Sequence, residues 1–194
     1  MITSLLEVSD LAYAPQAKLL FSGLSFVLMP GEILQVVGNN GSGKTSLLKL
    51  LSGLLPVEHG KVVRHTEGLL YIGHKLGIKL GLTVLENLQE IAVLHQAVNP
   101  RALTQALEQF ELQAILHLPC AYLSAGQRQR VALTRLLLLH IKLWILDEPF
   151  AHLDKHSCDI VTQCIHQHCA AGGGLVLTAH QQLSFPAIQQ TVFL

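Results

Sequence analysis

The sequence predicts an α/β fold in which buried strands and helices surround a phosphate-binding loop. The main observation is an apolar run at 33–37 that leads into a glycine-rich turn at 38–45 and then a leucine-rich segment at 46–51. Two further apolar stretches, 143–146 and 175–178, have the length and composition of strands buried in a parallel sheet. The 194 residues suffice for one domain with a sizeable core.

The glycine-rich turn has the spacing G-x-x-x-x-G-K-[ST] of a phosphate-binding loop. Its residues are Gly38, Asn39, Asn40, Gly41, Ser42, Gly43, Lys44 and Thr45. Glycines allow the backbone to wrap closely around an anion, and the following helix presents its positive dipole end to that anion. We expect Lys44 to reach the β- and γ-phosphates of a nucleotide, and the Thr45 hydroxyl to ligate Mg²⁺.

The other elements are predicted from hydrophobic periodicity and from residues that begin or end helices. Further strands are expected at 2–8, 24–28, 61–64, 69–72 and 191–194, with Tyr13 in a polar loop between the first two. Helices are expected at 43–52, 83–96, 99–110, 123–140 and 155–171. Gly53 suits the C-cap of the first helix. Thr83 and Glu86 have the spacing of a capping box, and Asn99 precedes a proline that begins the next helix.

The middle of the chain changes in composition after the strand at 69–72. A loop with glycines and lysines is followed by two amphipathic helices and no apolar strand. We therefore expect 73–122 to form a helical subdomain. It is inserted into an α/β core made of 1–72 and 123–194, within a single domain of 194 residues.

Two consecutive carboxylates follow the apolar strand at 143–146. Open α/β sheets bind their ligands at the carboxyl ends of the strands, which is where Asp147 and Glu148 lie. Consecutive strand residues point to opposite faces, so we expect separate roles for the two acids. Asp147 suits Mg²⁺ binding, and Glu148 suits the general base that polarises a water against the γ-phosphate.

A second anion site is predicted at the start of the helix at 123–140. A serine and a glycine lie there, within the run Ser124, Ala125, Gly126 and Gln127. One chain does not need two anion sites for the same γ-phosphate. If two copies faced each other head to tail, however, the site at 124–127 of one copy could contact the γ-phosphate bound by the phosphate loop of the other. His180 follows the strand at 175–178, which favours a place beside Asp147 in one cleft.

Composition limits the class of function. The net charge is zero without a run of Lys or Arg, which counts against nucleic-acid binding. No apolar run is long enough to span a bilayer, and residues 1–10 lack a basic stretch followed by an apolar one, so we expect no export signal there. The four cysteines lack C-x-x-C spacing, so reduced thiols are expected. His166, His168 and Cys169 match no zinc spacing, so we expect a surface helix end there.

In their order along the chain, these motifs resemble the ATP-binding subunit of ABC transporters over essentially its whole length. The family is a P-loop NTPase with a mixed sheet core, a small antiparallel β subdomain and an inserted helical subdomain. The resemblance implies that 38–45 and Ser46 bind ATP, with Mg²⁺ held by Thr45 and Asp147. It also implies that Ser124, Ala125, Gly126 and Gln127 contact ATP bound by a second copy, in a head-to-tail dimer. It further gives 151–154 a place across the dimer interface, makes His180 a γ-phosphate contact and makes Tyr13 the adenine-stacking aromatic.

Within that family, several stretches resemble the ATPases of cytochrome c maturation. They are 20–26, 73–74, 77–79, 85–88 and the alanine at position 125. This resemblance implies ATP hydrolysis at the cytoplasmic face of a bacterial inner membrane, with polytopic membrane subunits that hand haem to a periplasmic chaperone. It also predicts that the surface that docks those subunits lies near 73–90.

Two positions depart from the family pattern. Ala125 stands where most members have Gly, and a methyl is tolerable at a helix start. Lys75 stands where the family has a Gln that offers a carbonyl oxygen to Mg²⁺ and the attacking water, whereas Lys has only donors. We expect slow basal turnover, with Lys75 repositioned by the membrane partner.

Other functions remain open from the sequence. The cargo could be that of a lipoprotein or amino-acid system, because membrane subunits choose it. A soluble ABC ATPase acting on DNA or ribosomes would be expected to carry tandem cassettes or a long coiled-coil insert, together with a basic surface, whereas this chain has one cassette, a short insert and no net charge. A small-molecule kinase would need the phosphate loop but not the run 124–127.

Overall fold

The computed structural model describes residues 3–94, 99–179 and 188–194. The chain folds into two compact units. The first unit comprises 1–74, 141–148 and 166–194, and the second comprises 75–140 and 149–165. Both the phosphate loop and the carboxylates therefore belong to the first unit, whereas Ser124, Gly126 and the segment 151–154 belong to the second.

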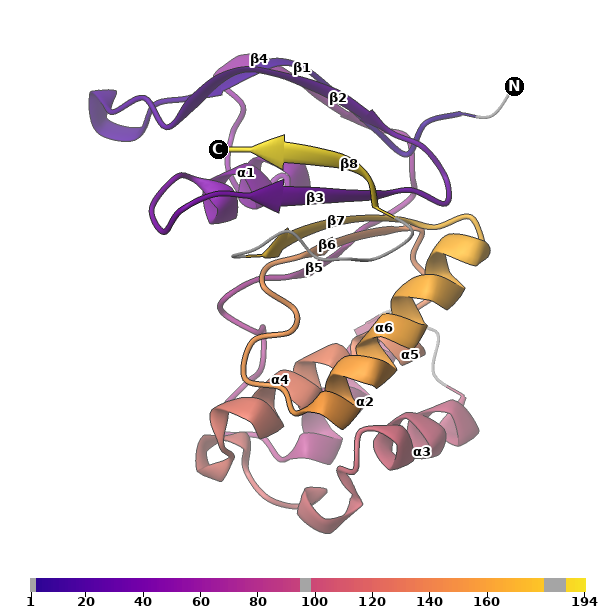
Figure 1. Cartoon of the computed structure of the whole chain (residues 1–194). Coiled ribbons are helices and arrows are strands. Elements are labelled where there is room, and N and C mark those ends of the chain that lie inside the picture. Colours follow the sequence, from indigo (N-terminus) through magenta and orange to yellow (C-terminus); the bar gives the residue numbers. More distant parts are fainter. Residues whose placement is uncertain (1–2, 95–98, 180–187) are drawn as a thin grey trace. The chain divides into compact units, whose positions relative to one another are not determined.

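The strands of the first unit form two sheets (Figure 1). The smaller sheet is antiparallel, in the order β2 (Phe21–Leu28), β1 (Leu6–Tyr13), β4 (His59–Arg64). The larger sheet is parallel, in the order β5 (Leu70–Ile72), β6 (Leu143–Leu146), β7 (Gly174–Ala179), β3 (Ile33–Val37), β8 (Ile188–Phe193). The predicted α/β fold is thus confirmed, and β3, β6 and β7 end at the same edge of the parallel sheet.

The helices divide between the units. The first unit holds α1 (Lys44–Ser52), and the second holds α2 (Val84–Leu94), α3 (Pro100–Gln109), α4 (Ala125–Leu133) and α5 (Arg135–Leu138). The long α6 (Lys155–Ala170) runs from the second unit into the first. Three 3₁₀ turns complete the described elements: η1 (Pro15–Ala17), η2 (Gln113–Ile115) and η3 (Cys120–Tyr122). Every helix in the described ranges is too short or too polar to cross a lipid bilayer.

The core of the first unit forms around α1. Its leucines at positions 47, 48, 50 and 51 are fully buried against apolar side chains of both sheets. In Figure 1 the antiparallel sheet is the upper layer of this unit, with α1 and the parallel strands below it. At the carboxyl end of α1, Gly53 takes the predicted left-handed C-cap conformation at φ 81°. Arg64 of β4 donates to two carbonyls of the last turn. These contacts fix the helix that carries Lys44 and Thr45.

The second unit is organised by caps and by one buried amide. Thr83 and Glu86 form the predicted capping box, and Asn99 caps α3 by accepting the Arg101 N–H at 2.9 Å. Asn87 of α2 is buried, and its side chain both accepts the Lys79 N–H (2.8 Å) and donates to Lys79 O (3.0 Å). Asn87 therefore closes the loop that precedes α2.

Several predicted elements differ in extent from the observed ones; β2 begins at Phe21 rather than at residue 24, and β8 begins at Ile188 rather than at residue 191. The expected helix at 123–140 is interrupted at Thr134, where the Leu137 N–H bonds to Thr134 O at 3.1 Å in a tightened i→i+3 turn. The expected strand at 2–8 extends instead to Tyr13, because β1 pairs with β2 up to the register pair Tyr13–Phe21. Tyr13 is therefore a strand residue and not part of a polar loop.

Candidate nucleotide site

The phosphate loop joins β3 to α1 in the first unit, as the sequence predicts. Gly43 precedes the first residue of α1 with φ 109°, a conformation that L side chains rarely adopt. A Cβ there would also lie 3.1 Å from Cδ1 of Phe21, so glycine is favoured by conformation and avoids a tight contact with that ring. Phe21 is buried under the loop, a role that its sequence position alone does not reveal.

Lys44 lies inside the loop and is only 6% exposed. Its ammonium donates to Gly38 O at 2.7 Å and to Asn39 O at 3.1 Å. An ammonium has three donors, so one remains for a phosphate oxygen. Ser42 Oγ is buried without a hydrogen-bond partner among the described residues. An anion in the loop would therefore meet both a cation and an unpaired hydroxyl.

A chain of hydrogen bonds joins the loop to the two acids. Thr45 Oγ1 donates to Asp147 Oδ2 at 2.7 Å, across 102 positions of sequence. Thr178 of β7 donates to the other carboxylate oxygen, Asp147 Oδ1, at 2.6 Å. The same Thr178 hydroxyl accepts the Glu148 N–H at 2.8 Å. Asp147 is buried, so its position is set by these two hydroxyls.

The backbone of Glu148 corrects one expectation. The strand β6 ends at Leu146, and Glu148 has φ 49°, in the left-handed region. The two acids therefore lie beyond the strand, where the chain turns, and the strand alternation that the prediction invoked does not apply to them. A non-glycine residue in this region is uncommon and is strained by about 1 to 3 kcal/mol.

Tyr71 of β5 also lies near the acids. Burial raises the pKa of the Tyr71 hydroxyl to about 12, with a smaller contribution from the negative charge of Asp147. The Tyr71 ring also covers Gly73, because a Cβ at that glycine would lie 2.3 Å from the Tyr71 hydroxyl oxygen. The phenol therefore stays protonated at neutral pH and can act as a hydrogen-bond donor at this edge of the sheet.

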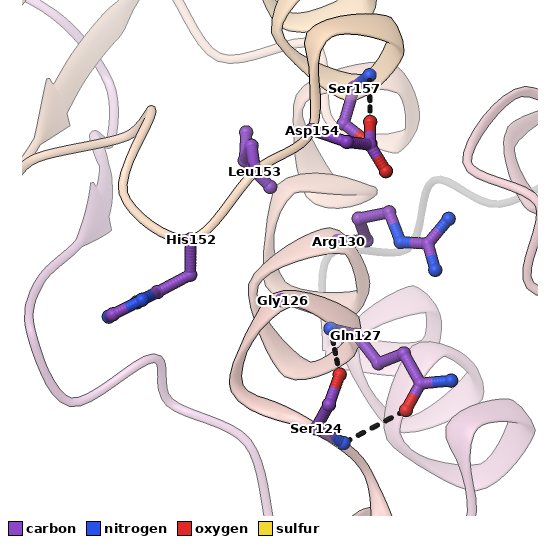
Figure 2. Close-up of a pocket in the computed structure, with 8 residues that line it drawn as sticks. All are labelled: Ser124, Gly126, Gln127, Arg130, His152, Leu153, Asp154 and Ser157. Carbon is purple, nitrogen blue, oxygen red and sulfur yellow. Dashed lines mark hydrogen bonds between the residues drawn. The ribbon is translucent and has the colours of Figure 1, made fainter.

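The predicted second anion site is a polar pocket of about 250 Å³ in the second unit (Figure 2). Eight residues line it: Ser124, Gly126, Gln127, Arg130, His152, Leu153, Asp154 and Ser157. Ser124 is the N-cap of α4 and accepts the Gln127 N–H at 3.1 Å, while Gln127 Oε1 accepts the Ser124 N–H at 2.9 Å. The reciprocal pair is a capping box, which the spacing S-x-x-Q could have revealed.

The segment 151–154 packs directly on the start of α4. A Cβ at Gly126 would lie 2.6 Å from the carbonyl oxygen of His152, so glycine permits this approach. The Ser157 N–H donates to Asp154 Oδ1 at 2.7 Å and holds the pKa of Asp154 below its usual range, aided by Arg130 and His156. The structure thus brings Ser124, Gly126 and Gln127 together with 152–154 in one pocket.

The structure also places most of the other residues that the sequence analysis singled out. Tyr13 is half-buried with its ring centroid 6.1 Å from that of Phe21, and Lys75 is exposed. His180 lies outside the described residues. The expected surface helix end is wrong for His168, which stacks on Trp144 at 3.7 Å, and for Cys169, which is buried. Within the described ranges, no three His, Cys, Asp or Glu side chains gather as a metal site.

The residues present fit ATP and Mg²⁺. The loop offers turned backbone N–H groups, the Lys44 ammonium and the unpaired Ser42 hydroxyl, all suited to phosphate oxygens. Mg²⁺ prefers a few carboxylate and hydroxyl oxygens together with substrate phosphates, and Thr45 and Asp147 provide such a pair.

Comparisons with known proteins show the family of this chain. The profile of the ABC transporter family matches residues 21–151. The cytochrome c biogenesis ATP-binding export protein CcmA of Pseudomonas putida (strain GB-1) is 44% identical over 189 residues, covering 92% of this chain and 90% of the relative. Its counterpart in Yersinia pestis is 42% identical over 190 residues, covering 92% and 87%.

Solved structures show the same fold. An ATP-binding subunit of an ABC transporter superposes with a TM-score of 0.83 and 28% identity, covering 91% of this chain and 80% of that one. An ABC transporter of the metal-chelate type, in an inward-facing conformation, has a TM-score of 0.78 and 29% identity, covering 98% and 80%.

Proposed function

We propose that this chain, which belongs to the ABC transporter family and within it to the cytochrome c biogenesis ATP-binding export proteins, is the ATP-hydrolysing subunit of a cytochrome c maturation complex. ATP hydrolysis is coupled to haem export, or to release of a haem-loaded periplasmic chaperone, through integral-membrane subunits. The observation that carries the ATPase proposal is the bonded pair Thr45–Asp147 at the end of the phosphate loop.

Each residue of the first-unit site has a proposed task. The loop 38–45 and Ser46 hold the phosphates, with Lys44 neutralising the charge of the β- and γ-phosphates. Thr45 and Asp147 hold Mg²⁺, which when bound neutralises charge that develops on the phosphate oxygens. Glu148 accepts a proton from the attacking water, and Tyr13 stacks on the adenine. His180 contacts the γ-phosphate.

The pocket at the start of α4 is proposed to serve a second copy of the chain. Ser124, Ala125, Gly126 and Gln127 would face ATP bound in the phosphate loop of that copy, in a head-to-tail dimer. This proposal is supported by the polar pocket that Ser124, Gly126 and Gln127 line together with 152–154, and by the exposed N-terminal end of α4, which attracts anions. Two nucleotides would then be enclosed by two chains.

The partners and place follow from the cytochrome c maturation proposal. Polytopic subunits of the bacterial inner membrane would hold the chain at the cytoplasmic face, as a peripheral protein. The helical subdomain at 73–122 is proposed to contact them, through a surface near 73–90. Binding of ATP would close the dimer and hydrolysis would open it, which is a population shift that membrane subunits can follow.

Affinity purification tests both whether the chain is a transporter subunit and whether that transporter serves cytochrome c maturation. Tagged Glu148→Gln protein is purified from detergent-solubilised membranes with ATP and Mg²⁺, because loss of the base should hold the closed dimer. A Lys44→Ala protein, which should not retain nucleotide, is the control. We expect small polytopic cytochrome-maturation proteins in the first sample and fewer in the second. A different permease would replace the cargo proposal, and a sample without membrane proteins would contradict the transporter proposal.

A further inference from the structure

Thr178 has a place in the site that no motif of the sequence assigns to it. It lies on β7 and is fully buried, at 0% exposure. Its hydroxyl is the hydrogen-bond partner of both Asp147 and the Glu148 backbone. One side chain on a neighbouring strand therefore contacts the two consecutive acids.

The directions of these bonds follow from the chemistry of the groups. The Glu148 N–H is a donor only, so the Thr178 oxygen accepts it at 2.8 Å. The single proton of the hydroxyl is then available to Asp147 Oδ1, at 2.6 Å. With Oδ1 engaged, Oδ2 is the atom that faces Thr45, at 2.7 Å. Because each hydroxyl holds one of the two equivalent oxygens, Thr178 fixes the rotation of the Asp147 carboxylate, which is proposed to share Mg²⁺ with Thr45.

The second bond acts on a strained backbone. Glu148 has φ 49°, which is unfavourable for a residue with a side chain. The bond from its N–H to a fully buried hydroxyl opposes relaxation of this turn, because relaxation would break a hydrogen bond that is partly shielded from water. The direction of the Glu148 side chain depends on the backbone that this bond holds.

We propose that Thr178 is a positioning residue for ATP hydrolysis, which sets the Asp147 carboxylate toward Thr45 and holds the turn that aims Glu148. The inference rests on the proposed function. It adds to that function a residue that touches no nucleotide and acts through the two acids.

The test compares Thr178→Val with Thr178→Ser. Valine has nearly the same shape but lacks the hydroxyl, whereas serine keeps the hydroxyl and loses a methyl. Thr134→Val is the matched control, since Thr134 is equally buried and its hydroxyl donates to Arg130 O at 2.9 Å, within α4–α5. Thr178→Ala replaces the valine variant if the latter does not fold.

The first readout needs no nucleotide. Amide hydrogen exchange of the segment 146–150 is measured in the nucleotide-free protein, where we expect Thr178→Val to accelerate exchange at Glu148 by about tenfold or more. Thr178→Ser and Thr134→Val should leave that exchange unchanged. Equal amide exchange rates at Glu148 in wild type and Thr178→Val would overturn the proposal that Thr178 stabilises the turn.

The second readout separates binding from turnover. We expect Thr178→Val to lower kcat roughly 10- to 100-fold and to raise the Mg²⁺ concentration needed for half-maximal activity. Its affinity for ATP without Mg²⁺ should change less than about twofold, because the loop is intact. Thr178→Ser should recover most of the rate. Wild-type kcat in Thr178→Val, or equal loss in both Thr178 variants, would refute the inference. An inactive wild type would instead refute the proposed function, while the exchange data still judge Thr178.

Discussion

Replacing Arg64 by methionine should loosen the helix that carries the phosphate loop, far from the loop itself. Arg64 of β4 donates from Nε to Leu51 O at 2.6 Å and from Nη2 to Leu50 O at 3.1 Å, at the carboxyl end of α1. A cation there also interacts favourably with the helix dipole. Methionine keeps an apolar stem and removes both the charge and the donors.

The expected cost follows from these contacts. A hydrogen bond to a charged group contributes about 1.5 to 3 kcal/mol. Leu50 O also accepts the Gly53 N–H at 3.2 Å, so the loss falls mainly on Leu51 O. Arg64 is partly exposed, so water can replace some of the contact. Together with a lost dipole interaction of about 0.5 kcal/mol, the free energy of unfolding should fall by about 2 kcal/mol. For a chain of this size that is about 4 to 8 °C in Tm.

Thermal and urea unfolding followed by circular dichroism measure this change. Arg64→Lys should lie between wild type and Arg64→Met, because one ammonium cannot reach both carbonyls in the same way. Arg101→Met, on the exposed surface of α3, is the matched control and should change stability by less than about 0.5 kcal/mol. A Tm for Arg64→Met equal to that of Arg101→Met would refute the capping role.

Three further predictions concern other parts of the chain. Gly126→Ala should lower ATP-dependent dimerisation severalfold, because its Cβ would meet His152 O at 2.6 Å; unchanged dimerisation by light scattering would contradict this. Burial lowers the pKa of His168 below its usual value of 6.5. As the pH falls below that value, the unfolded chain is protonated at His168 more readily than the folded chain, so the free energy of unfolding should decrease. Urea unfolding should show a flatter pH dependence for His168→Gln, and equal slopes would refute it. Lys75→Gln should change basal or partner-stimulated ATPase rates, and identical rates in both assays would reject a role for Lys75.

Local motifs explain what could be predicted from the sequence. Phosphate-loop spacing, the Gly53 cap and the capping box at Thr83 each depend on residues within one or two turns, so they are legible without tertiary contacts. The apolar strand at 143–146 was predicted with its observed bounds, because a strand buried on both faces is uniformly apolar. Asp147 and Thr45 could be paired only because both belong to known sequence patterns.

Other features depend on contacts that are distant in sequence. Thr178 is one more residue in an apolar strand until β7 brings its hydroxyl to Asp147 and Glu148, 31 and 30 positions away. The left-handed turn at Glu148 likewise has no local signal such as glycine. His168 stacks inward on Trp144, a residue of another element 24 positions away. Strand pairing, not composition, decides that Tyr13 belongs to β1.

The central claim is that the first-unit site hydrolyses ATP with Glu148 as the base. Turnover of purified wild type and Glu148→Gln, measured at saturating ATP and Mg²⁺ beside their ATP affinities, tests it most directly. We expect Glu148→Gln to retain ATP binding and to lose about 10²- to 10⁴-fold in kcat, the usual contribution of a positioned base. A Glu148→Gln protein that turns over ATP at the wild-type rate would contradict the account.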